Sequence, residues 1–160
     1  MRCCAMPSVA SRIASVGGLG CLPVGPGTAG SAVGLSLALA GVRTIGPGAT
    51  LALAAAAVWP CIWCGTQAER DTGQHDPGWI ILDEVIGMAV VGAVLPWIAD
   101  GWAWWAAAFV LFRAFDVIKP PPLRWLARWP GGQGILFDDL GASGYTLAVL
   151  WVTRLMTIGW

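Results

Sequence analysis

Apolar segments with acidic residues at their edges are the feature that most constrains how this chain can fold. Hydrophobic residues make up 57% of its 160 residues and charged residues 11%, a balance typical of integral membrane proteins. Six of the nine carboxylates lie in three short clusters beside the apolar segments: Asp76 with Asp83 and Glu84, Asp116, and Asp138 with Asp139. Ionisable groups at membrane depth are costly and usually functional, and gathered carboxylate oxygens suit a hard divalent cation.

Five apolar segments are predicted to be helices: residues 31–42, 50–64, 85–98, 102–118 and 140–158. Several fall short of the roughly 20 residues that a full span needs, but unpaired strands would leave backbone groups unsatisfied in lipid. Gly46-Pro47-Gly48 predicts a turn between the first two segments, and whether the first one crosses or re-enters the membrane stays open. We expect an all-α, small polytopic membrane helix bundle of about four to five apolar helices, forming one domain over residues 1–160.

The basic residues predict the orientation of this bundle. If the N-terminus is cytoplasmic and the chain crosses five times, nearly all of them lie inside or at the inner boundary: Arg2, Arg12, Arg70, Arg113, Lys119, Arg124 and Arg128. Arg43 and Arg154 fall outside. The three acidic clusters then share the inner side, which predicts one composite site at the cytoplasmic face. The formal net charge is zero, so no basic surface suggests nucleic acid as a partner.

The two acid pairs are candidate metal ligands. Asp83 and Glu84 are adjacent, so on a helix they serve one metal ion together only at the helix start, or if one of them acts through an intervening ligand. Asp138 and Asp139 are predicted to open the last helix, where they fit a metal site. For both pairs the alternative is stabilisation of a helix N-terminus through its dipole.

Three charged residues at the end of the fourth segment are candidates for binding an anion. Arg113, Asp116 and Lys119 are spaced i, i+3 and i+6, which predicts one stripe on a helix with an acid between two bases. The alternative is a ladder of salt bridges without a ligand. The position of the stripe beside the other acids favours function.

The segment Gly25 to Ser31 contains a GxGxxG match, but neither a preceding strand nor a following acid supports a dinucleotide site. Its glycines and the hydroxyls of Thr28 and Ser31 come where a helix begins, a place suited to phosphate. A simple N-terminal cap with flexible glycines is the alternative.

His75 is the only histidine and lies in a polar loop with Asp71 and Asp76 nearby. A general acid/base or ligand role is open, as is a structural one. Cys61 and Cys64 form a CxxC pair within an apolar segment, and no second pair completes a zinc site.

Four blocks of the sequence, in order, resemble the phosphatidylglycerophosphatase A family over about residues 17–150. They are PGTAGS at Pro26, LDEVIGM at Leu82 after the His75-Asp76 loop, FRAFDVIKP at Phe112 and GQGILFDD at Gly132. Residues 1–7, with Cys3-Cys4, depart from this pattern. The family consists of small bacterial inner-membrane enzymes that hydrolyse phosphatidylglycerophosphate to phosphatidylglycerol and phosphate with Mg²⁺.

The resemblance implies a multi-pass lipid phosphatase acting by Mg²⁺-assisted attack of water. Mapping the blocks onto this chain gives three sets of expected site residues: Asp83, Glu84, Asp138 and Asp139 for the metal; Thr28, Ser31, Arg113 and Lys119 for phosphate; His75, Asp83, Asp116 and Asp139 for catalysis. His75 is expected to protonate the leaving alkoxide. A phosphatase of another phospholipid, or a small ion or solute transporter lined by the acids, remains an alternative.

Overall fold

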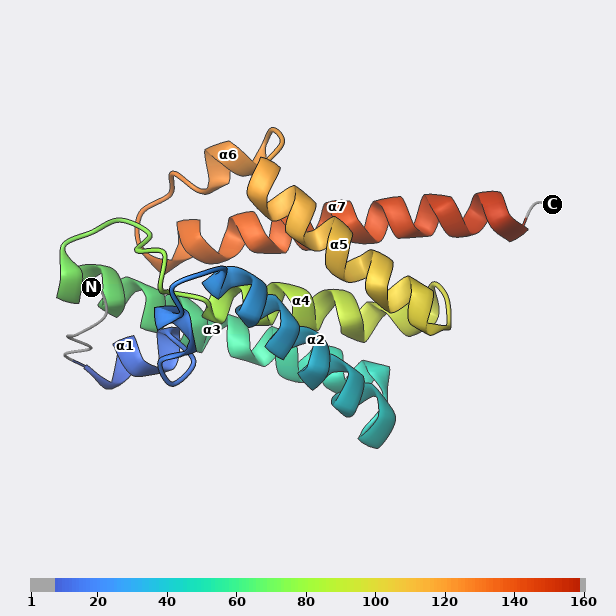
Figure 1. Cartoon of the computed structure of the whole chain (residues 1–160), viewed down its shortest axis with the longest axis horizontal. Helices are drawn as coiled ribbons and strands as arrows, with labels where there is room; N and C mark the ends of the chain where they lie inside the picture. Colours follow the sequence, from blue (N-terminus) through green and yellow to red (C-terminus); the bar gives the residue numbers. More distant parts are fainter. Residues whose placement is uncertain (1–7, 159–160) are drawn as a thin grey trace.

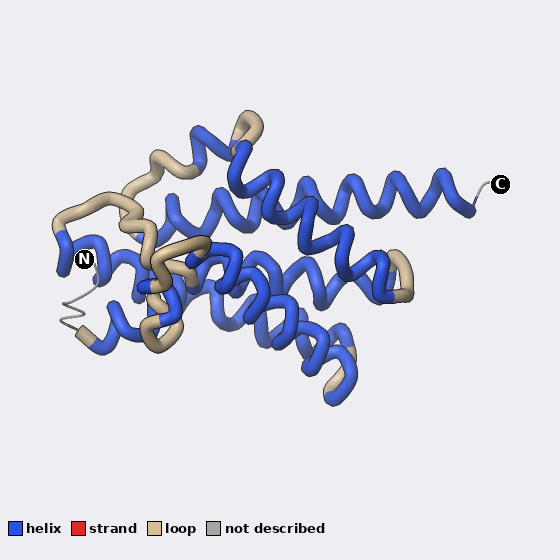
Figure 2. The backbone as a smooth tube through the Cα atoms, in the orientation of Figure 1, coloured by secondary structure: helices blue, strands red, loops and turns tan. Residues whose placement is uncertain are grey.

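The computed structural model describes residues 8–158, and this part of the chain contains helices and no strands (Figures 1 and 2). The all-α expectation is therefore confirmed for the described residues. The atypical segment 1–7, with Arg2 and Cys3-Cys4, lies outside them. The elements in order are α1 (Val9–Ala14), η1 (Leu19–Cys21), α2 (Pro26–Thr44), α3 (Pro47–Thr72), α4 (Leu82–Val94), η2 (Leu95–Trp97), α5 (Trp102–Ile118), α6 (Leu123–Leu126) and α7 (Gly132–Ile158).

Two helices, α3 and α7, are long and apolar enough to cross a membrane by length and composition. The turn predicted between the first two apolar segments is confirmed, because α2 ends at Thr44 and α3 begins at Pro47. The α5 helix ends at Ile118, directly before Lys119 and the prolines that follow it. Proline cannot continue a helix, and the residue before it is also restricted.

The predicted start of the last helix was wrong. It begins at Gly132 instead of near Asp138, so both aspartates lie about two turns inside α7. They therefore cannot act as its N-terminal cap. The α3 helix also runs further than the predicted segment 50–64, to Thr72.

Glycines bring α2 very close to α4. A Cβ atom on Gly30 would lie 2.9 Å from the carbonyl oxygen of Ile81, and one on Gly34 would lie 2.3 Å from that of Val85. Only residues without a side chain allow such an approach between two helix backbones. The start of α2 is thereby fixed against the first turn of α4, which carries Asp83 and Glu84.

The largest buried cluster joins α4, α5 and α7, and its biggest fully buried side chains are Met88, Leu95 and Phe112. In Figure 1 the beginnings of α2, α4 and α7 and the end of α5 lie in the same half of the bundle. The α2–α3 and α4–α5 turns and the C-terminal part of α7 lie in the other half. Four segments distant in sequence therefore meet where the polar residues are.

Candidate active site

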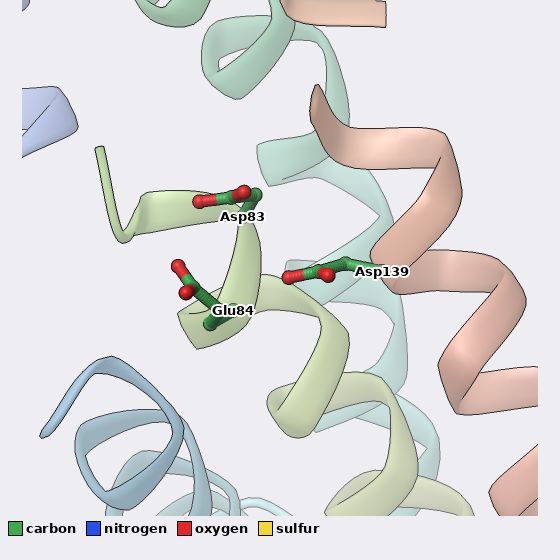
Figure 3. A group of neighbouring side chains, drawn as sticks. All are labelled: Asp83, Glu84 and Asp139. Carbon is green, nitrogen blue, oxygen red and sulfur yellow. The ribbon is translucent and has the colours of Figure 1, made fainter. Parts of the chain in front are cut away.

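Three carboxylates from two helices form the centre of the candidate site. Asp83 and Glu84 come from the first turn of α4, and Asp139 projects toward them from α7 (Figure 3). One oxygen atom of each side chain lies within 4.8 Å of the others. In residues 8–158 no other set of histidine, cysteine, aspartate or glutamate side chains gathers its ligand atoms in this way.

Each of these carboxylates keeps one buried oxygen without a hydrogen-bond partner: Asp83 Oδ1, Glu84 Oε2 and Asp139 Oδ2. Asp83 is 7% exposed and Asp139 only 2%. Burying carboxylates beside one another without partners is strongly unfavourable, so unpaired oxygens of this kind call for an explanation. A divalent cation that prefers oxygen ligands would satisfy all three, and the donor set fits Mg²⁺.

Arg113 on α5 borders the acids. Its Nη1 lies 3.8 Å from Glu84 Oε1 and donates to Asp116 Oδ2 at 2.5 Å and to Ser31 Oγ at 3.4 Å. Asp116, one turn along α5, is thus placed to fix the orientation of the guanidinium. The positive charge of Arg113 therefore lies beside Glu84, one of the three carboxylates of the group.

The three-residue stripe expected on α5 is broken at its last member. Lys119 follows the helix in a left-handed conformation, with φ of 47°, and its ammonium contacts Asp138 of α7 instead of Asp116. Burial lowers the pKa of Lys119, but the hydrogen bond from its ammonium to Asp138 and the negative charges of Asp138, Asp76 and Asp139 together outweigh this effect, so the net shift is upward. Asp138, expected to bind metal, is thus paired with a base.

The first turns of α2 complete the site on the side of Arg113. Ser31 Oγ donates to the carbonyl of Gly27 at 2.9 Å, and the Thr28 side chain is exposed. A Cβ on Gly27 would lie 2.3 Å from Glu84 Oε1 and 3.1 Å from both terminal nitrogens of Arg113. Gly27 is the site residue that the sequence reasoning missed, although it lies within the PGTAGS block.

The contacts of His75 are with residues outside the group of three carboxylates. Its Nδ1 is 2.7 Å from Glu69 Oε1 and its Nε2 is 3.2 Å from the carbonyl oxygen of Ala127, and the side chain is 52% exposed. Burial lowers the pKa of His75, but the carbonyl of Ala127 and the charge of Glu69 outweigh it and raise the pKa overall. Both ring nitrogens are therefore already engaged. Asp71, which was considered as a neighbour of His75, instead accepts hydrogen bonds from Ser8 and Ser11 of the α1 region.

Cys61 and Cys64 are free and buried within α3. Neither belongs to the group of gathered ligand atoms.

Comparison with known proteins agrees with the four sequence blocks. The sequence model of the family described as phosphatidylglycerophosphatase A matches residues 12–154. The Escherichia coli protein named phosphatidylglycerophosphatase A is 43% identical over 86 residues, which cover 53% of this chain and 49% of that protein. The chain thus aligns with about half the length of this relative.

Two further relatives align over most of their length. The phosphatidylglycerophosphatase A of Haemophilus influenzae is 35% identical, over 86% of this chain and 83% of its own. A Bacteroides thetaiotaomicron protein named putative phosphatidylinositol-3-phosphatase is 33% identical, over 86% and 88%. No solved structure matches the chain significantly. From the extent of the family match and of the Haemophilus alignment, we conclude that this chain is a member of the phosphatidylglycerophosphatase A family.

Proposed function

We propose that the protein hydrolyses the phosphate monoester of phosphatidylglycerophosphate, releasing phosphatidylglycerol and inorganic phosphate. Family membership and the names of the Escherichia coli and Haemophilus influenzae relatives support this substrate. The observation that carries the proposal is the group of three carboxylates, each with a buried unpaired oxygen, one of which, Glu84, lies 3.8 Å from Arg113. Oxygen ligands for a cation next to a fixed guanidinium suit phosphoryl chemistry.

We propose Asp83, Glu84 and Asp139 as the residues that hold Mg²⁺. When bound there, Mg²⁺ would polarise a phosphoryl oxygen and make water more acidic. Asp138 is proposed to act on the site through Lys119, whose ammonium it contacts, in place of the direct metal ligation expected from its sequence block.

Arg113 and Lys119 are proposed to bind the phosphate group. Asp116 fixes the guanidinium of Arg113, which leaves its remaining donors for phosphate oxygens. Ser31 contacts the same guanidinium, and Thr28 lies exposed in the first turn of α2. Backbone N–H groups at the start of a helix favour an anion, so this turn is suited to receive phosphate oxygens.

The reaction requires water to attack phosphorus, the bond from phosphorus to the glycerol oxygen to break, and that oxygen to gain a proton. Buried Asp83 and Asp139 keep the reacting groups away from bulk water. Proton delivery by His75 stays a prediction. Its contacts support a different role, anchoring the loop between α3 and α4 to the end of α6, because Glu69 and Ala127 occupy both ring nitrogens.

We propose that α2, α3, α4, α5 and α7 cross a bacterial inner membrane, with the site at the cytoplasmic face. The lengths and apolar composition of α3 and α7 support membrane insertion. A single polar face is supported because the acids lie in the same half of the bundle as Arg113 and Lys119. An excess of Lys and Arg is typical of the cytoplasmic side of membrane proteins.

A different phospholipid phosphomonoester is the second candidate substrate, favoured by the name of the Bacteroides thetaiotaomicron relative. Phosphate release from phosphatidylglycerophosphate, phosphatidylinositol 3-phosphate and phosphatidic acid should be measured with the same purified protein. The highest kcat/KM is expected for phosphatidylglycerophosphate. A clear preference for another lipid would replace the proposed substrate and leave the site assignment in place.

The test of the activity is release of inorganic phosphate from phosphatidylglycerophosphate by purified protein. EDTA is expected to stop release and added Mg²⁺ to restore it. Release that continues unchanged in EDTA would remove the metal from the proposal. Absence of release from folded protein with Mg²⁺, together with cation flux into vesicles, would instead support the transporter alternative.

A further inference from the structure

An apolar cavity of about 410 Å³ lies between α2, α3 and α4. Its size falls within the range of small-molecule sites, which is about 300–1,000 Å³. With the exception of the Thr50 hydroxyl, its side chains are hydrocarbon, glycine or cysteine. The wall is formed by Ile13 of α1, by residues between 37 and 41 of α2 and Ile45 directly after it, and by residues between 50 and 61 of α3 and between 82 and 89 of α4.

Small residues leave this space unfilled. Ala38 and Gly41 on α2, Ala57 on α3 and Ala89 on α4 line the cavity, where larger side chains would close it. Leu37 and Leu53 on its border are 58% and 62% exposed, so the cavity opens toward the outer surface of the α2–α3 hairpin. From Thr50 to Cys61 the α3 wall extends about 16 Å, at about 1.5 Å per residue.

One end of the cavity adjoins the acid site. Leu82 and Val85, which line it, directly flank Asp83 and Glu84 in the sequence of α4. Cys61 and Ile86, also in its wall, pack with Leu136 of α7, one turn before Asp139. The other end is formed by Ile45 and Thr50 at the α2–α3 turn, in the opposite half of the bundle.

We propose that this cavity binds one acyl chain of the lipid whose phosphate group is hydrolysed at the acid site. The inference rests on the proposed function and deepens it. A polar centre that suits a phosphate group adjoins an apolar space through Leu82, Val85 and Cys61, and this pairing matches the two parts of a phospholipid. In lipid the gain comes from packing, because each methylene that fits the cavity exchanges loose contacts with neighbouring lipid tails for closer contacts with fixed side chains.

The acyl chain thereby contributes to specificity. It holds the lipid with its phosphate end beside Arg113 and Glu84, so binding energy from a remote part of the substrate orients the reacting bond. A soluble phosphate ester would reach the acids without this alignment.

The experiment uses a phosphonate analogue of phosphatidylglycerophosphate that cannot be hydrolysed and carries a diazirine on one acyl chain. Full-length protein with Mg²⁺ is irradiated, and the labelled residues are identified by mass spectrometry. A phosphatidylcholine with the same diazirine chain reports contact with bulk lipid. Ala57→Phe and Ala89→Phe fill the cavity from two different helices, and Ala55→Phe on the exposed face of α3 is the matched control.

The expected result is selective labelling of cavity residues by the phosphonate lipid. Labelling should fall several-fold in both filled variants, because the added ring occupies the space of the acyl chain, and should persist in Ala55→Phe. Three results would overturn the proposal. The first is equal labelling by the phosphatidylcholine probe, and the second is labelling that neither filled variant reduces. The third is crosslinks from the cavity to a second copy of the chain.

Phosphate release is measured on the same preparations. The filled variants should lose several-fold in kcat/KM for a long-chain substrate, because the chain no longer fits the cavity, and little for a short-chain one. Wild-type protein that is labelled selectively but releases no phosphate would contradict the proposed activity while supporting the lipid site. Protein that releases phosphate but is never labelled in the cavity would contradict the lipid site while supporting the proposed activity.

Discussion

Among single residues, the three acids with unpaired oxygens give the sharpest prediction. Asp139→Asn and Glu84→Gln each keep the shape of the side chain but remove one negative charge from the group. We expect phosphate release to fall at least about 100-fold in each, because the negative charge that would hold Mg²⁺ is reduced. Turnover and Mn²⁺ binding, followed by electron paramagnetic resonance, should be lost together.

Asp100→Asn is the matched control for these variants, since Asp100 is exposed at the turn before α5, in the opposite half of the bundle. It should leave turnover and metal binding unchanged. Near-normal turnover in both acid variants would remove the metal assignment, whatever the control does.

His75 gives a prediction that depends on pH. Because contacts with Glu69 and Ala127 raise its pKa above the ordinary value of 6.5, the folded state binds the proton more tightly than the unfolded state. This contribution to stability is fully present below the ordinary pKa and is lost as the pH rises through the raised one. His75→Gln should therefore lower Tm more at about pH 5.5 than at about pH 9.

Turnover of His75→Gln separates anchoring from proton delivery. Anchoring predicts a loss of a few-fold, whereas loss of a proton donor costs about 100-fold or more. If the difference in Tm between the wild type and His75→Gln is the same at both pH values, the anchoring role is also contradicted.

At this scale the sequence pointed to the acids but not to all of their partners. Asp83, Glu84 and Asp139 come from sequence blocks 55 residues apart, and the structure brings them together. The pairing of Lys119 with Asp138 could not be predicted, because it depends on Lys119 leaving the helix at a left-handed residue. The i, i+3 and i+6 spacing rule assumes that the helix continues to Lys119, whereas α5 ends one residue earlier, at Ile118.

At the scale of helices, the start of α2 is expected to be sensitive to a single methyl group. Gly27→Ala would place Cβ 2.3 Å from Glu84 Oε1, so either α2 or the Glu84 and Arg113 side chains must move. Overpacking of this kind costs about 1–3 kcal/mol, and kcat/KM should fall about 10- to 100-fold. Phosphate release and the Tm of the purified variant are the measurements.

Gly48→Ala is the control for this substitution. Gly48 lies in the first turn of α3, and a Cβ added there would meet nothing within 4 Å. It should keep wild-type turnover. Equal activity of both variants would show that close contact at the start of α2 does not position Glu84 or Arg113.

Glycines also explain where the predicted helix boundaries were wrong. Gly132 and Gly134 precede the predicted start of the last helix at Asp138, but both belong to α7. A Cβ on Gly132 would lie 2.2 Å from the carbonyl oxygen of Ile62 in α3, and one on Gly134 would lie 2.1 Å from that of Trp129. Their role is close approach of backbones, which a single sequence does not distinguish from a turn.

For the whole molecule, the arrangement of polar residues predicts the direction in which the chain crosses the membrane. Composition predicts the all-α architecture, and the acid clusters predict one polar end of the bundle. The number of crossings depends on whether short helices such as α4 span the bilayer. Five crossings with a cytoplasmic N-terminus put the α3–α4 loop inside and the end of α7 outside.

Fusions of full-length and truncated chains to two reporters test this topology. Alkaline phosphatase, which is active only outside the cytoplasm, should be active after Trp160 and inactive after Gln74 in the α3–α4 loop. Green fluorescent protein at the same two positions should give the opposite pattern. An inactive phosphatase fusion after Trp160 with a fluorescent counterpart would mean an even number of crossings. An active alkaline phosphatase fusion after Gln74 would place the acid site on the outer face of the membrane. The protein would then have to take its substrate from the outer leaflet.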